Sequence, residues 1–214
     1  MAVLTEEQTL LKDQAHAWVR EEANVTVFRQ MRDSGTSSGF DDNTWNKMVE
    51  LGWCGIIIPE IYGGTGLDYR TFGVVLEELG RGLTASPLFA SSLVGASALL
   101  GGSEDQQREW LPRIASGQAI VTLAVDESPH HNPANIVLSA ARAGDSYTLS
   151  GVKTFVLEGP SADAFVVAAR TSGPDTSEEG ISLFVVPGDA NGLSRTRLTM
   201  ADRRGYADIT FDKV

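Results

Sequence analysis

The spacing of apolar residues changes near residue 118. Before that point they recur three and four residues apart, as on one face of a helix. After it they alternate or form short β-branched and aromatic runs between turn residues, which is typical of strands. The sequence therefore predicts an α+β multidomain fold: an all-helical N-terminal domain at 1–118, then a small antiparallel β-barrel or sandwich domain at 119–214.

The helical half carries clear start signals. Capping residues are expected at Thr5, Asp42, Asp68, Ser86 and Ser103. Thr5 and Ser103 are each followed three residues later by Gln, which makes two capping boxes, and Ser86 is followed by a proline at the first helical position. Five or six helices are expected. The buried face of the first helix should contain Leu10, Leu11, Gln14, Ala15, Trp18 and Val19.

Several polar residues in this half have ordinary interpretations. Glu77 and Glu78 are adjacent on a helix and so point about 100° apart, which favours a solvated face over a pair of facing catalytic carboxylates. His16 is expected to be a surface or internally bonded histidine. The glycine turn at 63–66 lacks the Lys-Ser/Thr ending of a phosphate loop, so its glycines are expected to serve the backbone.

The stretch from Ala119 to Gly159 is the centre of the β half. It predicts a strand at Ala119–Val125, a polar loop at Asp126–Asn135, a strand at Ile136–Ala141, a turn at 143–146 and a strand at 147–157. Further strands are expected at 164–169, 181–186 and 208–211, with a solvated loop at 171–180. A loop with free main-chain donors beside an aromatic residue can form a shelf for a flat polar ring system.

Composition excludes several classes. The net charge is −11, and both halves are acidic, with 9 Lys+Arg against 16 Asp+Glu in residues 1–118 and 8 against 12 in the rest. Nucleic acid and anionic membranes are therefore disfavoured as partners. Cys54 is the only cysteine, so no internal disulfide forms. The N-terminus lacks the features of a signal peptide and no segment is expected to span a membrane, so a cytoplasmic location is predicted.

A set of short motifs occurs in order along nearly the whole chain. In the helical half they are Leu51-Gly52-Trp53, Pro59-Glu60-Ile61-Tyr62-Gly63-Gly64-Thr65-Gly66-Leu67, Leu76-Glu77-Glu78-Leu79-Gly80-Arg81, Gly102-Ser103-Glu104-Asp105-Gln106 and Trp110-Leu111-Pro112. In the β half they are Gly151-Val152-Lys153-Thr154-Phe155, Ala169-Arg170-Thr171, Gly180-Ile181-Ser182 and Phe211-Asp212-Lys213-Val214. With these motifs the chain resembles the acyl-CoA dehydrogenase family.

The resemblance implies a flavin-dependent oxidation of an acyl-CoA thioester at its α and β carbons, with FAD as cofactor. It also implies an electron-transferring flavoprotein as electron acceptor and a homo- or hetero-oligomer. The residues implied to bind the cofactor are Leu123, Val125, Asp126, Ser128, His131, Asn132, Phe155, Val156 and Leu157. A C-terminal helical domain, expected to carry the catalytic glutamate, follows the β-domain in the family, and the sequence stops at Val214 before it.

The sequence departs from the family in the implied flavin site. Asp126-Glu127-Ser128 stands where relatives have Thr-Glu-Pro, and a carboxylate at neutral pH accepts hydrogen bonds but cannot donate them. Phe155-Val156-Leu157 replaces Trp-Ile-Thr, so the second hydroxyl near the flavin is lost as well. Each such bond contributes roughly 0.5–1.5 kcal/mol net, so altered flavin properties are expected rather than loss of binding.

The adjacent His130 and His131 point apart on an extended chain and lack a third ligand, so no metal site is expected. The sequence leaves two roles open for them: they bind a phosphate of FAD or CoA, or they only fill the loop.

Three alternatives for the function of the chain stay open on the sequence alone. The chain is an acyl-CoA dehydrogenase shortened or cleaved before its last domain, or a non-catalytic subunit of a heteromeric one. The third alternative is a flavin-free interaction module of the same fold. Acyl chain length is not readable.

Overall fold

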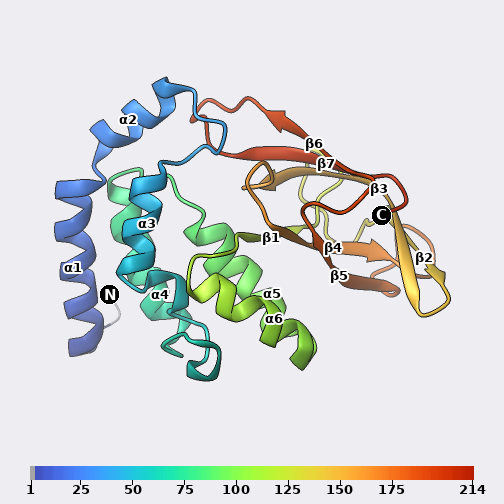
Figure 1. Ribbon diagram of the computed structural model, residues 1–214, viewed down its shortest axis with the longest axis horizontal. Helices are drawn as coiled ribbons and strands as arrows, with labels where there is room; N and C mark the ends of the chain where they lie inside the picture. Colours follow the sequence, from blue (N-terminus) through green and yellow to red (C-terminus); the bar gives the residue numbers. More distant parts are fainter. Residues whose placement is uncertain (1–2) are drawn as a thin grey trace.

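The structure is a computed structural model that describes residues 3–214. Helices lie on one side of the molecule and a curled sheet on the other (Figure 1). The helical part, in chain order, consists of α1 (Glu6–Glu22), α2 (Val25–Ser34), α3 (Asp42–Glu50), η1 (Trp53–Gly55), η2 (Glu60–Tyr62), α4 (Tyr69–Arg81), η3 (Leu88–Gly95), α5 (Ala96–Leu100) and α6 (Glu104–Ala115). In the described residues no helix combines the length and apolar character needed to cross a membrane.

The cap residues confirm most of the predicted helix starts. Both capping boxes form, at Thr5 before α1 and at Ser103 before α6. Asp68 caps α4 by accepting from the main-chain N–H of Thr71. The prediction for α3 was wrong by one residue, because Asp41 rather than Asp42 accepts from Thr44.

The segment predicted to start at Ser86 is wound differently. Residues Leu88–Gly95 form a π-helix, which continues into the short α5, and Pro87 precedes it with no side-chain cap. The expected N-cap at Ser86 is therefore wrong. A π-helix is rare and occurs often at functional sites, and here it packs directly against the first strand.

The β part is a seven-stranded curled sheet, confirming the predicted fold class. Its strands are β1 (Val121–Ala124), β2 (Ser139–Ala143), β3 (Ser146–Leu157), β4 (Ala164–Arg170), β5 (Ile181–Pro187), β6 (Leu193–Leu198) and β7 (Tyr206–Phe211). The order is β1-β4-β2-β3-β7-β6, with β5 paired to β4. Most pairings are antiparallel as expected, but β4 pairs in parallel with β1 and, at one residue, with β2.

The predicted β-hairpin is confirmed, with Gly144 in the left-handed region between β2 and β3. Strand β1 is shorter than the predicted Ala119–Val125, since it spans only Val121–Ala124, and two further details differ from the sequence prediction. Strand β2 begins at Ser139 rather than Ile136, because the main-chain N–H groups of Val137 and Leu138 donate to the Glu127 carboxylate instead of a neighbouring strand. Strand β6 was not predicted, since its LSRTRL sequence is mostly polar and the strand lies at the sheet edge.

Strand β4 lies between two apolar clusters and is buried along its whole length. Ala164 and Val166 belong to the cluster built mainly by the helices. Phe165, Val167 and Ala169 belong to the cluster inside the curled sheet. Because successive side chains of a strand point to opposite faces, this single strand joins the helical core to the β core.

Two expectations about the helical surface were wrong. Leu10 and Gln14 were placed on the buried face of α1, but Leu10 is 71 % exposed and Gln14 is exposed as well. Glu78 was expected on a solvated face, yet its carboxylate is buried and contacts His16 Nδ1 at 2.9 Å and Arg81 Nε at 3.2 Å. Glu77 is exposed as expected and pairs with Arg81. The His16 side chain is thus internally bonded while half exposed, as predicted.

Candidate functional site

The polar loop between β1 and β2 lies at the surface of the β part. Asp126 and Glu127 at its start are partly buried, and residues 128–133 are exposed. In the described chain, the main-chain N–H groups of Asp126, Glu127 and Ser128 have no protein acceptor within hydrogen-bond distance. Partly buried main-chain donors normally have partners, so the N–H groups of Asp126 and Glu127 are available to a ligand, and that of the exposed Ser128 is open to solvent.

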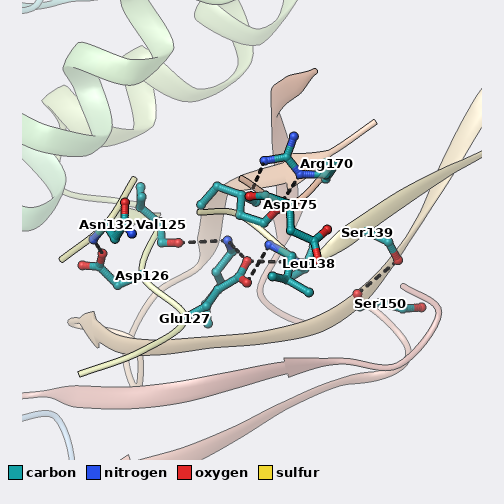
Figure 2. Close-up of polar contacts among 12 residues, drawn as sticks. Val125, Asp126, Glu127, Asn132, Leu138, Ser139, Ser150, Arg170 and Asp175 are labelled. Carbon is teal, nitrogen blue, oxygen red and sulfur yellow. Dashed lines mark hydrogen bonds and ion pairs between the residues drawn. The ribbon is translucent and has the colours of Figure 1, made fainter. Parts of the chain in front are cut away.

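Glu127 fixes both ends of this loop. Its carboxylate accepts from the main-chain N–H of Val137 at 2.8 Å and of Leu138 at 3.0 Å, and it pairs with Lys153 Nζ at 2.6 Å. Figure 2 shows Glu127 between Val125 and Leu138. The Lys153 side chain is fully buried and also donates to the Val125 carbonyl at 2.9 Å. Burial lowers the pKa of Lys153, while the adjacent Glu127 carboxylate acts in the opposite direction.

Arg170 holds the far end of the loop. Its buried guanidinium donates to the carbonyl of Ile136 at 2.6 Å and of Ala134 at 3.4 Å. It also donates to four carbonyls of the segment after β4, those of Ser172, Asp175, Ser177 and Glu179. The contact with Asp175 is visible in Figure 2. One arginine therefore joins the loop to the exposed turn at 171–180.

Asp126 is engaged by the loop itself. Its carboxylate contacts His131 Nδ1 at 2.9 Å and accepts from the main-chain N–H of Asn132 at 3.3 Å, the second contact being drawn in Figure 2. The predicted site residues Asp126, His131 and Asn132 are thus brought together. Ser128 bonds only within the loop, to the carbonyl of His130. No group of three or more His, Cys, Asp or Glu among residues 3–214 is arranged to hold a metal ion.

Phe155 lies on a bulge of β3. The pairing of β3 with β7 loses its register between Lys153 and Val156, and Phe155 has a φ of +52°. Phe155 is 42 % exposed. The main-chain carbonyl of Asp126 accepts from the Thr154 N–H at 2.7 Å, which places the start of the loop beside this bulge.

The other predicted site residues are buried or already engaged in contacts within the protein. Val156 is 2 % exposed and packs inside the sheet, and its carbonyl accepts from the main-chain N–H of Gly159. Leu123 packs against the helical core. The Leu157 carbonyl accepts from the Thr122 hydroxyl at 2.7 Å. Val125 uses its carbonyl to hold Lys153.

The strand ends at a buried carboxyl group. Glu158 is fully buried, and its Oε1 lies 3.3 Å from Arg204 Nη2 while Oε2 has no hydrogen-bond partner. Burial raises the pKa of Glu158 to about 7, against the opposing effect of Arg204. Arg204 also donates to the Ser86 carbonyl, so it links the β part to the helical part as interdomain pairing would.

Two large cavities lie away from Phe155. One of about 560 Å³ is formed by α6 and the turns around Ser161 and Gly188. The other, of about 510 Å³, lies between the end of α4, α2 and the loop before β7, with Leu83 and Arg204 in its wall. Neither Phe155 nor residues 126–133 line these two cavities.

Sequence reasoning missed the residues that hold the site in place: Lys153, Glu127, Arg170 and Asp208, whose carboxylate accepts from the main-chain N–H of Phe155. Lys153 and Arg170 appeared only as parts of motifs. A lysine inside a predicted strand, with no charged residue within four positions on either side, is a usable signal, since buried charges need partners. Its partner, 26 residues upstream, could not be paired with it from the sequence.

Family models match almost the whole chain. The N-terminal domain of acyl-CoA dehydrogenases matches residues 5–118, and the middle domain matches residues 125–214. Among curated proteins, the acyl-CoA dehydrogenase FadE12 of Mycobacterium tuberculosis is 30 % identical over 92 % of this chain and 50 % of its own length. A cyclohex-1-ene-1-carbonyl-CoA dehydrogenase of Syntrophus aciditrophicus is 32 % identical over 90 % of this chain and 46 % of its own.

Solved structures match the fold of this chain. The ChsE4-ChsE5 complex from Mycobacterium tuberculosis has a chain with a TM-score of 0.87 and 28 % identity, matched over 100 % of this chain and 56 % of its own length. A Tcur3481-Tcur3483 steroid ACAD variant gives 0.87 and 31 %, over 98 % of this chain and 55 % of its own. The chain thus spans about half the length of its relatives. It belongs to the acyl-CoA dehydrogenase family.

Proposed function

We propose that this chain forms two domains of an acyl-CoA dehydrogenase: the helical domain at residues 1–118 and the flavin-facing β-domain at residues 119–214. The reaction is the oxidation of an acyl-CoA thioester at its α and β carbons. The observation that supports it most directly is the outward Phe155 ring beside a loop with unused main-chain donors, in a chain matched to both family domains.

The chemistry of this surface fits FAD. The isoalloxazine ring is flat, with carbonyl and ring-nitrogen acceptors at its edge. Phe155 offers an exposed aromatic face, and the N–H groups of Asp126, Glu127 and Ser128 offer donors at the loop start. When bound, FAD supplies the acceptor for the hydride from the β carbon.

The residues of this chain bind and orient in this proposal. Glu127 and Lys153 hold the loop, Phe155 stacks on the ring, and Asp126 with His131 lies at the edge of the surface. The base that removes the α proton is not assigned to Glu127 or Glu158, because both carboxylates are already engaged by Lys153 and Arg204.

Acyl-CoA is the proposed substrate, an electron-transferring flavoprotein the proposed acceptor, and a homo- or hetero-oligomer the proposed assembly. A second candidate is a non-catalytic subunit of a heteromeric dehydrogenase. It is favoured by the Asp126 carboxylate and the Leu157 side chain, which remove two possible hydroxyl donors. A similar structure is itself a ChsE4-ChsE5 complex.

The test uses the full-length protein, purified with any partner chain that accompanies it. We expect a visible flavin absorbance spectrum, bleached under anaerobic conditions by a suitable member of an acyl-CoA panel. Phe155→Ala should weaken FAD binding by about tenfold, equivalent to roughly 1.4 kcal/mol. Phe155→Trp, which keeps an aromatic face, is the matched control.

Absence of flavin from the purified protein, together with no thermal stabilisation by added FAD, would overturn the proposal. Flavin that binds but is bleached only in the presence of a second polypeptide carrying its own flavin site would support the non-catalytic subunit instead.

A further inference from the structure

The backbone at Phe155 is held in an unfavourable conformation. A positive φ is uncommon for any residue other than glycine, and for a bulky side chain it is a true outlier. Phe155 has a φ of +52° at the point where β3 loses its register with β7. Such strain persists only when neighbouring groups over-determine the conformation, and it is concentrated at functional sites.

Asp208 supplies that restraint. It lies on β7 opposite the bulge, and its Oδ1 accepts from the main-chain N–H of Phe155 at 3.2 Å and from the Thr154 hydroxyl. The bulge takes the Phe155 N–H out of the strand ladder, so the carboxylate replaces the carbonyl that a regular strand would provide. Asp208 itself is partly buried, whereas the Phe155 ring projects outward.

We propose that Asp208 is the positioning residue that fixes Phe155 as the stacking surface for the flavin. The inference rests on the proposed function. Asp208 does not touch the cofactor in this proposal; it holds the bulge so that the ring is already in its binding orientation. Pre-organisation of this kind strengthens binding because less freedom is lost when the ligand arrives.

The first test needs no flavin. In the 214-residue chain, hydrogen exchange at the Phe155 amide is compared between wild type, Asp208→Ala and Asp208→Asn. Asparagine keeps a side-chain oxygen that can accept both bonds, so we expect Asp208→Asn to retain the protection of the Phe155 amide. In Asp208→Ala the protection of this amide should fall by about tenfold or more. Asp212→Ala, an exposed aspartate just past β7, is the control.

The second test measures the cofactor. In the full-length protein, Asp208→Ala should weaken FAD binding by about tenfold, as Phe155→Ala does, and should give a similar change in the visible circular dichroism of the flavin. Asp208→Asn should restore both readouts. The double variant Asp208→Ala/Phe155→Ala should bind FAD as tightly as either single variant does, because both substitutions remove the same stacking surface.

The stability of the variants provides a check that does not depend on FAD. Glycine adopts a positive φ without strain, so Phe155→Gly should relieve the destabilisation caused by Asp208→Ala, and should rescue that variant if it does not fold alone. Wild-type exchange and FAD binding in Asp208→Ala, or no relief by Phe155→Gly, would overturn the role of Asp208. If the wild-type protein binds no FAD, the proposed function fails, while the exchange and stability results still decide whether Asp208 holds the bulge.

Discussion

The fully buried Glu158 pairs with the partly exposed Arg204, 3.3 Å between Oε1 and Nη2, at the junction of the sheet and the helices. Arg204 also donates to the Ser86 carbonyl at 2.9 Å, whereas Glu158 Oε2 has no partner. Arg204 Nη2 thus has two partners, whereas Arg204 Nε and Glu158 Oε2 have none among the described residues. A carboxyl group in this position is costly to ionise.

The cost of ionising Glu158 predicts how the stability of the chain depends on pH. Burial raises the pKa of Glu158 from 4.5 to about 7 in the folded chain. The folded state therefore retains a proton that the unfolded state releases, and the contribution of Glu158 to stability falls as the pH rises from about 4.5 to 7. Glu158→Gln should increase the free energy of unfolding at pH 8 by roughly 1–3 kcal/mol and change it little at pH 4.

Urea unfolding at the two pH values measures this difference. Glu60→Gln, which removes an exposed carboxylate, serves as the control. Equal effects of Glu158→Gln at pH 4 and pH 8 would contradict the prediction.

Lys153→Met should destabilise the chain strongly. The substitution keeps the apolar stem but leaves the Glu127 carboxylate without its cation, and removing one partner of a buried pair costs about 3–5 kcal/mol. Thermal and urea unfolding check the loss, with the exposed Lys213→Met as the matched variant. A loss no larger than that of Lys213→Met would show that the pair does not hold the loop.

Glu78 behaves in the opposite way to Glu158. Burial alone would raise the pKa of Glu78, but the hydrogen bond from His16 and the charge of Arg81 outweigh it and hold the pKa below 4.5. Its contribution is therefore present above pH 4.5 and lost as the pH falls through the lowered value. Glu78→Gln should destabilise by about 1–3 kcal/mol at pH 7, and the loss should shrink at pH 3.

Glu77→Gln provides the comparison, since Glu77 pairs with the same Arg81 at the surface. We expect a change of less than about 1 kcal/mol for it. Similar losses for the two variants at pH 7 would refute the distinction.

The junction between the loop after α2 and the loop before β7 is close-packed. A Cβ at Gly39 would overlap the main chain of Arg204 and Gly205, and Gly39 has a φ of +86°. Gly39→Ala should cost roughly 3 kcal/mol or more, against about 1 kcal/mol for Gly35→Ala, where φ is +70° but nothing lies within 4 Å. Differential scanning calorimetry of the two variants separates the backbone cost from the overlap, and equal losses would disprove it.

The sequence predicts what depends on neighbouring residues. Capping boxes at Thr5 and Ser103 and the turn at Gly144 involve groups a few residues apart, and all three are confirmed. The late start of β2 and the burial of Glu78 depend on contacts between residues distant in sequence, which no local pattern contains.

The candidate site shows the same division. Its position, at a loop after the first strand and at an aromatic residue on the third, was predicted, and the binding roles of its residues stay a prediction. The bulge at Phe155 was not foreseen, because the aspartate that accepts its N–H lies 53 residues away. Nor was the burial of Val156, since the bulge changes which side chains face outward after it.

Strand β4 has a practical consequence for dividing this chain. Releasing residues 119–214 from the helices would expose the side chains of Ala164 and Val166 to water, and the helices would lose the surface against which they are built. Each fragment should therefore aggregate when it is expressed by itself. Exchange of one half with that of a relative should succeed only if strand β4 and its helical contacts are transferred together.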